Sequence, residues 1–345
     1  MERKKLEEKI REKIIELKKH MQDKTGWSIF LGAGASKCAH LPTMRELTSI
    51  VLNEMNEGKA SQIIKEIIKN LKEDTSTLNP TIEDILEELY LLLHLKEEKK
   101  IEIEITYGNI RNIDREVIQE SISSIKKIIK RECSGKGSLE IYKKFITYWM
   151  MGMSEVNIFT TNWDSLIEIT CDKLHIKCID GFSGIYEPFI DLAVYDDEIR
   201  RNGEKIKIVK LFKIHGSIDW IKERGSIRKK INSQSEVEDE IMIYPTPLKT
   251  REVLSYPYSE LLRRLDNEIR GKSKKLLIIG YSFPDSHIND IIKQALQNES
   301  FSLFIIDPNL TIENVQSILG DYPGIFDPIS TTFEKFVDLL TSEVT

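Results

Sequence analysis

The stretch Trp27-Ser-Ile-Phe-Leu-Gly-Ala-Gly-Ala-Ser36 places a short, mostly apolar run directly before a glycine-rich turn. Such a run followed by glycines is typical of a buried β-strand that ends in a tight turn. Thr43 and Glu46 then form a T-x-x-E capping box, which predicts the start of a helix. This part of the chain therefore predicts a strand, a glycine-rich turn and a helix, in that order.

Four later segments have the same short apolar pattern, and helical patterns follow several of them. They are Val156–Thr160, Ile206–Ile214, Lys275–Gly280 and Ser302–Ile306. Short apolar strands that alternate with helices indicate a parallel sheet. We therefore predict an α/β fold with a doubly wound parallel sheet.

The spacing of hydrophobic residues divides the rest of the chain into segments with different predicted structure. Residues 1–26 predict an amphipathic N-terminal helix that packs on the domain or on a second copy of the chain. Residues 45–150 are helical in pattern, except for the ambiguous alternation at 101–105, and predict a helical insertion. Residues 151–345 supply the remainder of the core, so that 1–345 forms one domain.

The charge, the hydrophobic pattern and the cysteine spacing limit the classes of protein to which this chain can belong. The 345 residues include 50 basic and 56 acidic ones, a formal net charge of −6, which disfavours direct nucleic-acid binding. No apolar run approaches the roughly 18 residues of a membrane span, and the charged N-terminus has no apolar signal segment. We therefore expect a cytoplasmic protein without a membrane partner. The four cysteines form no C-x-x-C pair, so neither a disulfide framework nor a zinc knuckle is predicted.

Glycine or short polar residues follow every predicted strand. In an open α/β sheet, ligands bind beyond the carboxyl ends of the strands. A purely structural sheet would not need such residues at all of these ends, so we expect a binding site there. The segments are Gly32–Ser36, Thr161–Asp164, His215–Ser217, Gly280–Ser282 and Asp307–Asn309.

The glycine-rich turn and the later stretch 280–284 disfavour several common enzyme classes. Gly32 and Gly34 would let the backbone approach a pyrophosphate. Lys37 replaces the third glycine of G-x-G-x-x-G, which disfavours an ordinary dehydrogenase, and no P-loop motif occurs. The stretch 280–284 lacks the final glycine of a nucleophile elbow, which disfavours an esterase.

Four motifs in order resemble the sirtuin-like fold, in particular the bacterial NAD-consuming effectors of anti-phage defence. The resemblance covers about 27–36 and 156–309, but not the helical insertion. It implies a Rossmann-like doubly wound parallel sheet with a large helical insertion, and an NAD glycohydrolase that releases nicotinamide and ADP-ribose. The motifs are GAGAS at 32–36, TTNWD at 160–164, KIHGSIDW at 213–220 and IGYSF at 279–283.

The resemblance also implies roles for individual residues. Asn162 and His215 are expected to be catalytic, the first by placing water and the nicotinamide ribose, the second as a base. Asp164 is expected to hold the carboxamide, although it could instead cap the following helix. The remaining residues expected to bind NAD are Gly32, Ala33, Gly34, Ser36, Gly280, Ser282, Asp307 and Asn309.

Departures from the sirtuin pattern argue against protein deacylation. The P-D-F-R loop of sirtuin deacylases is matched only by Pro42 and Arg45, and their C-x-x-C zinc module is absent. We therefore expect NAD as substrate and no zinc. We expect His287, near Asp285 and Asn289, to begin a helix rather than to bind a metal.

The chemistry agrees with NAD cleavage. Breaking the glycosidic bond creates an oxocarbenium-like ribosyl cation, while nicotinamide leaves neutral and needs no acid. A histidine suits the base role near neutral pH, and a neutral asparagine can place water without adding charge. Without an acyl-lysine, water gives ADP-ribose; the residues leave hydrolysis and cyclisation open.

Unregulated NAD loss would kill a cell, so we expect control by homo-oligomerisation or by a partner. Related systems suggest a HerA-type ATPase or, alternatively, an Argonaute-type protein. Two other functions stay open. One is a non-catalytic NAD or ADP-ribose sensor or assembly subunit. The other is a nuclease-associated subunit that uses the basic stretch 222–240, which we predict to be a mobile surface loop.

Overall fold

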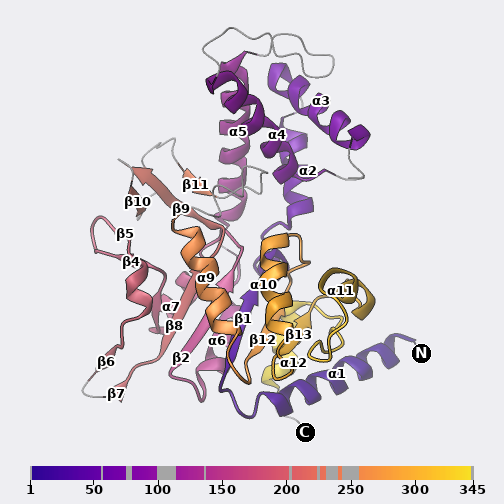
Figure 1. Cartoon of the computed structure of the whole chain (residues 1–345), viewed down its shortest axis with the longest axis vertical. Coiled ribbons are helices and arrows are strands. Elements are labelled where there is room, and N and C mark those ends of the chain that lie inside the picture. The colour runs from indigo at the N-terminus through magenta and orange to yellow at the C-terminus, as the bar shows by residue number, and fades with distance from the viewer. Residues whose placement is uncertain are drawn as a thin grey trace.

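Six strands, all paired in parallel, form the central sheet of the computed structural model in the order β13-β12-β1-β2-β8-β3 (Figure 1). The structure describes residues 2–55, 57–74, 80–98, 114–135, 137–201, 204–223, 226–230, 240–242 and 256–342. The strands are β1 Trp27–Leu31, β2 Glu155–Thr160, β3 Lys177–Ile179, β8 Ile208–Lys213, β12 Lys275–Ile279 and β13 Ser302–Ile306.

The strand order confirms the predicted doubly wound α/β sheet. From β1 the chain proceeds to β2, and after β8 it crosses back to β12 on the other side of β1. This reversal places a topological switch point beside β1, where open sheets bind their ligands. The sequence analysis missed β3, because its three residues, Lys177-Cys-Ile179, are too short for a recognisable period.

Helices cover both faces of the sheet, as the alternation of its side chains requires. Ile29 and Leu31 point to one core and Phe30 to the other. The first core is covered by α1 Glu2–His20, α6 Glu140–Met150, α7 Leu166–Leu174 and α12 Phe333–Thr341. The second is covered by α9 Tyr258–Ile269, α10 Ser286–Leu296 and α11 Ile312–Leu319.

The N-terminal helix α1 packs on its own domain. Ile10, Ile14 and Leu17 lie four, then three residues apart, and all three are buried in the first core. Of the two packing arrangements that the sequence leaves open for this helix, the structure therefore shows the intramolecular one.

A smaller antiparallel sheet lies beside the central one, in the order β11-β9-β10-β5-β4. In it, β9 at 216–223 pairs with β10 at 226–229, so the predicted surface loop at 222–240 is wrong for these strand residues. Residues 224–225 and 231–239 lie outside the described residues. Further elements complete the fold: β4 Phe182–Ser183, β5 Phe189–Ile190, β6 Arg200–Arg201, β7 Glu204–Lys205, β9 Gly216–Glu223, β10 Ser226–Lys229, β11 Glu240–Met242, and the 3₁₀ helices η1 Ala33–Ala39 and η2 Leu192–Tyr195.

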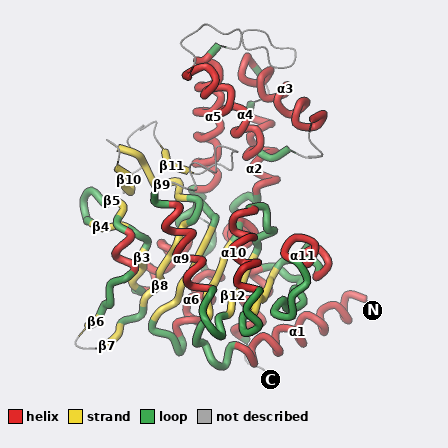
Figure 2. The backbone as a smooth tube through the Cα atoms, viewed as in Figure 1, coloured by secondary structure: helices red, strands yellow, loops and turns green. Residues whose placement is uncertain are grey.

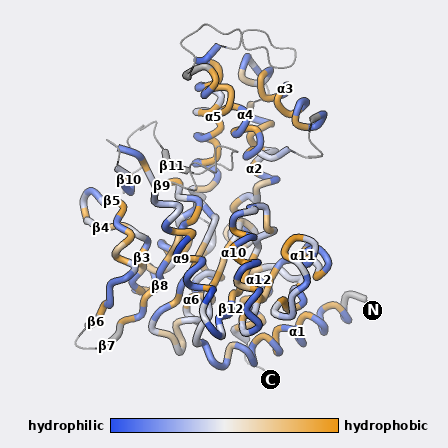
Figure 3. The backbone as a smooth tube through the Cα atoms, viewed as in Figure 1, coloured by the Kyte–Doolittle hydropathy of each residue, from blue (hydrophilic) through white to orange (hydrophobic). Residues whose placement is uncertain are grey.

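Four helices form a bundle that projects from the sheet, at the top of Figure 2. They are α2 Met44–Glu54, α3 Gly58–Asp74, α4 Ile82–Glu98 and α5 Arg115–Cys133. Apolar residues of all four form a separate core, and the stretches of hydrophobic colour in these helices are visible in Figure 3. The predicted capping box at Thr43 begins α2, whereas 101–105 lie outside the described residues.

Two residues of the sheet unit join the bundle to the sheet. Trp163 and Ile218 follow β2 and β8, and both are buried in the core of the bundle. By contrast α6, the last predicted helix of the insertion, packs on the sheet instead. Within the described residues, no helix has both the length and the apolar character needed to cross a bilayer.

Candidate functional site

The carboxyl ends of five strands lie in one row across the sheet. Neighbouring strands of a sheet are about 4.8 Å apart, so the segments that follow these ends begin side by side. The segments predicted to bind a ligand are therefore brought to one edge of the sheet. The paired last residues of the strands are, in order, Ile306, Ile279, Leu31, Thr160 and Lys213.

Asn162 and His215 occupy equivalent positions on two neighbouring strands. Each lies two residues beyond a member of the Thr160–Lys213 pair. The segments that carry them are also bonded to each other, since the N–H of Ile218, in β9 directly after His215, donates to the carbonyl of Trp163 over 3.1 Å. The structure therefore places the two predicted catalytic residues on adjoining, mutually bonded segments.

Ser36 joins the glycine-rich turn to the loop after β2. Its Oγ accepts a hydrogen bond from Asn162 Nδ2 over 3.0 Å and donates to Asp164 Oδ2 over 2.7 Å. Asn162 Nδ2 also donates to the carbonyl of Gly32 over 3.0 Å. These bonds fix the amide plane of Asn162 and one oxygen of Asp164 in a single network.

Asp164 also contacts the helix that follows it. Its Oδ1 accepts from the N–H of Leu166 over 3.1 Å, at the first turn of α7. Tyr142 also belongs to this network, since its hydroxyl lies 3.3 Å from Ser36 Oγ. Complete burial, together with the charge of Asp164, holds the pKa of Tyr142 well above its usual range. The tyrosine is therefore a neutral hydrogen-bonding partner rather than a base.

The glycines at the switch point let two parts of the chain approach each other. A Cβ at Gly34 would lie 2.8 Å from Gly280 Cα, and one at Gly280, where φ is +63°, would lie 2.5 Å from Ala35 N. The N–H groups of Gly32, Gly34 and Ala35 donate to carbonyls of Ile279, Gly280 and Gly32. These glycines therefore pack the turn after β1 against the turn after β12. The approach of a pyrophosphate to this turn stays a prediction.

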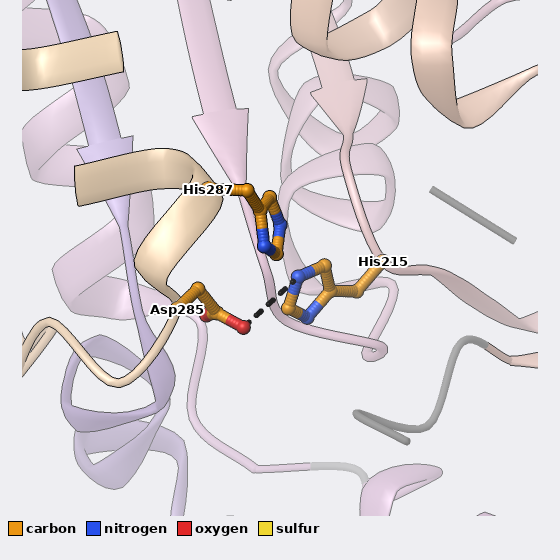
Figure 4. Close-up of side chains that lie close together, drawn as sticks. All are labelled: His215, Asp285 and His287. Carbon is orange, nitrogen blue, oxygen red and sulfur yellow. Dashed lines mark ion pairs between the residues drawn. The ribbon is translucent and has the colours of Figure 1, made fainter. Parts of the chain in front are cut away.

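A second cluster, not predicted from the sequence, surrounds His215. The side chains of His215, Asp285 and His287 point toward one another in Figure 4, the first from the end of β8 and the others from the start of α10. His215 Nε2 lies 3.6 Å from Asp285 Oδ1, and both residues are about 95% buried, with relative exposures of 4% and 5%. The sequence offered one signal, the D-x-H spacing shortly after IGYSF at 279–283.

Lys213, also missed by the sequence analysis, is a buried cation beneath the loops. Its Nζ donates to the carbonyl of Asp164 over 2.6 Å, to Ser217 Oγ over 2.5 Å and to Glu168 Oε1 over 3.1 Å. The side chain is only 1% exposed. Because its donors reach both loops, Lys213 holds the loop of Asn162 and the loop of His215 together.

The remaining predicted binding residues lie at the same edge but outside these networks. Asp307 is buried, and its Oδ1 accepts from the N–H groups of Asn309 and Leu310 over 2.8 and 3.2 Å. Burial raises its pKa. Ser282 and Asn309 are exposed, and Ala33 is partly exposed.

Part of the chain resembles a known protein family. Residues 156–322 match the family model of the SIR2-like domain. This part of the chain is similar to SIR2-like domains. The match supports an activity related to NAD, because SIR2-like proteins are in general NAD-dependent enzymes. It does not extend to the glycine-rich turn at 32–36, which the structure nevertheless joins to the SIR2-like region through Asn162 and Gly280.

A solved structure described as "The Structural basis of Sirtuin Substrate Affinity" aligns with 94% of this chain and 97% of its own. The sequence identity is 10% and the TM-score is 0.48. No curated protein sequence matches the chain.

Proposed function

We propose that this chain hydrolyses NAD⁺ at the bond between nicotinamide and ribose, giving nicotinamide and ADP-ribose. The observation that carries the proposal is the placement of Asn162 and His215. They stand at equivalent positions beyond paired strands, on segments bonded to each other, within a region similar to SIR2-like domains.

The donors and acceptors of this edge fit such a substrate. Asn162 uses its Nδ2 for Gly32 and Ser36, and among the hydrogen bonds of the described residues none is made to its Oδ1. That oxygen can accept from a water or a ribose hydroxyl. Asp164 has acceptor capacity beyond its bonds to Ser36 and Leu166, which suits a carboxamide NH₂.

The reaction balances without an added acid. NAD⁺ and water give nicotinamide, ADP-ribose and one proton, because the pyridinium nitrogen takes the bonding electrons and leaves neutral. Asn162 positions the water, and the His215 imidazole accepts its proton as the new C–O bond forms at the ribose. Asp285, 3.6 Å from His215 Nε2, orients the ring and stabilises its protonated form.

The resemblance to NAD-consuming defence effectors supports a biological role as a regulated effector of phage defence. NAD depletion by an uncontrolled enzyme is lethal, so activity would await self-association or a partner. A HerA-type ATPase is the first partner to test by co-purification, and an Argonaute-type protein the second. Constant full activity in a lone monomer would contradict this part of the proposal.

The test of the reaction is mass spectrometry of products after incubation of the purified chain with NAD⁺. His215→Ala should lower nicotinamide release by about 10²–10⁴-fold, the usual contribution of a general base. Asn162→Ala should cause a similar loss, and the double variant should be little worse, because both residues serve one transition state.

His175→Asn is the matched control. His175 is exposed and lies at the end of α7, before β3, and its left-handed φ of 54° is one that asparagine tolerates. This variant should keep full activity. Undiminished nicotinamide release from His215→Ala, at equal protein and NAD⁺, would show that the base is another residue.

One observation favours a second function, a sensor that binds NAD or ADP-ribose without turnover. Asn162, Ser36 and Asp164 form a continuous hydrogen-bonded network, which is as suited to rigid binding as to catalysis. Tight NAD binding by calorimetry, without nicotinamide release on prolonged incubation, would favour this function.

The nuclease-associated function receives less support from the structure. Arg228 forms ion pairs with Glu187 and Glu223, and Lys229 with Asp180 and Asp219. These cations of the basic stretch are thus neutralised within the chain rather than presented to a phosphate backbone.

A further inference from the structure

We propose that His215, Asp285 and His287 form a binding site for one divalent transition-metal ion, of the zinc class. Each residue offers one ligand atom, and the three atoms lie within 4.8 Å of one another (Figure 4). Among the residues that the structure describes, this is the one such group of histidine, cysteine and carboxylate side chains. The site departs from the expectation, drawn from the sequence, that His287 only begins a helix.

The distances are close to those that a metal requires. Zinc binds imidazole nitrogen and carboxylate oxygen at about 2.0–2.2 Å, so two ligand atoms of a tetrahedral ion are about 3.3 Å apart. His215 Nε2 and Asp285 Oδ1 are already 3.6 Å apart. Since the three atoms lie within 4.8 Å of one another, an ion would require the third ligand atom to approach by up to about 1.5 Å. His287, at the first turn of α10, is partly exposed, whereas His215 and Asp285 are buried, so we expect His287 to make this movement.

Asp285 is held in the orientation that a ligand needs. Its Oδ2 accepts from the hydroxyl of Tyr281 over 3.1 Å, which leaves Oδ1 toward His215. Asn289 stabilises the turn between Tyr281 and Asp285, because its Nδ2 donates to the carbonyl of Phe283 over 2.9 Å. Partners of this kind behind a metal ligand fix its orientation and raise metal affinity.

The donor set indicates which ions fit. Two imidazoles and one carboxylate are borderline ligands that suit zinc and its neighbours, whereas Mg²⁺ and Ca²⁺ prefer oxygen ligands alone. Three protein ligands also leave a fourth position open at a tetrahedral ion, as in catalytic rather than structural zinc sites.

Metal binding and base catalysis would exclude each other at His215, because coordination uses the lone pair that would accept the proton. If the proposed NAD hydrolysis holds, the site is therefore inhibitory, and zinc should suppress nicotinamide release over the concentration range in which it binds. This consequence rests on the proposed function, whereas the metal site itself does not.

The test is isothermal titration of the chelator-treated full chain with ZnCl₂, without NAD. Wild type should bind one ion. Asp285→Asn and His287→Ala should each weaken binding by more than about 100-fold, and Tyr281→Phe by about 10–100-fold, the usual effect of losing a partner behind a ligand. His175→Asn, which removes a distant imidazole, should bind as wild type, and MgCl₂ should give no binding heat.

Circular dichroism of each variant establishes that it is folded, so that lost binding reflects a lost ligand. The proposal is overturned if wild type binds no zinc, or if Asp285→Asn and His287→Ala, both folded, bind as tightly as wild type. Absence of zinc binding with intact NAD hydrolysis would overturn the metal site alone. If the chain binds zinc but its chelator-treated, metal-free form releases no nicotinamide, the metal site is supported and the proposed reaction is contradicted.

Discussion

At the scale of single residues, Ser36 is the link between the glycine-rich turn and the loop of Asn162. Its hydroxyl is an acceptor for Asn162 and a donor to Asp164, in an almost completely buried position. Ser36→Ala would remove both bonds and leave one oxygen of a buried carboxylate without its donor. We expect a loss of about 1–3 kcal/mol in the free energy of unfolding, and a fall in nicotinamide release because Asn162 loses its orientation.

Chemical denaturation and product assays of the same preparation measure both effects. Ser317→Ala is the control, since Ser317 is exposed and bonds only to the carbonyl of Asn314 within its own helix. If Ser36→Ala matched Ser317→Ala in stability and activity, the Ser36 network would have no functional role.

At the scale of elements, the contact between the turns after β1 and β12 depends on Gly280. This residue has a φ of +63°, and an added Cβ would meet backbone atoms of Gly34 and Ala35 within 2.6 Å. Gly280→Ala therefore combines an unfavourable backbone conformation with a backbone collision. We expect it to separate the two turns, to destabilise the protein and to reduce NAD binding.

Gly58→Ala is a matched control, because Gly58 also has a positive φ, +85°, but an added Cβ there would meet nothing within 4 Å. It should cost only about 1–2 kcal/mol, the backbone contribution alone. Denaturation midpoints of the two variants, compared at equal m-values, give the difference. Equal destabilisation would mean that the turns adjust to each other without cost.

At the scale of the whole molecule, the helical bundle is coupled to the site through Trp163 and Ile218. Trp163 stands between Asn162 and Asp164, yet its side chain is buried in the core of the bundle. A partner that moves the bundle would therefore move the loop of Asn162. Trp163→Ala should destabilise the chain by about 3–5 kcal/mol and also lower the rate of nicotinamide release by folded protein.

Leu89→Ala tests whether that second effect is specific. Leu89 is fully buried in the same core but lies on α4, away from the sheet. It should destabilise the protein by about 2–5 kcal/mol, while the activity of the folded fraction stays near that of wild type. A similar loss of activity in both variants would show that the bundle acts only through stability.

The parts of the fold predicted correctly were those encoded by neighbouring residues. The strand at 27–31, the capping box at Thr43 and the glycine at position 280 carry local signals, namely an apolar run, a side chain that reaches a nearby N–H and a turn residue. The loops at the strand ends were predicted for the same reason, since parallel strands bring their carboxyl ends to one edge.

Only the tertiary structure shows which side chains of those loops contact one another and which buried groups hold them. Lys213 lies in the predicted apolar strand Ile206–Ile214, and its local sequence does not show that its ammonium group is buried against carbonyls of another loop. Asp285 and His287 lie some seventy residues beyond His215 in the chain, and only the packing of α10 on the sheet brings them together. The hydrophobic pattern of one segment does not show which distant side chains will be buried together. Burial and side-chain contacts depend on how the helices and strands pack against one another.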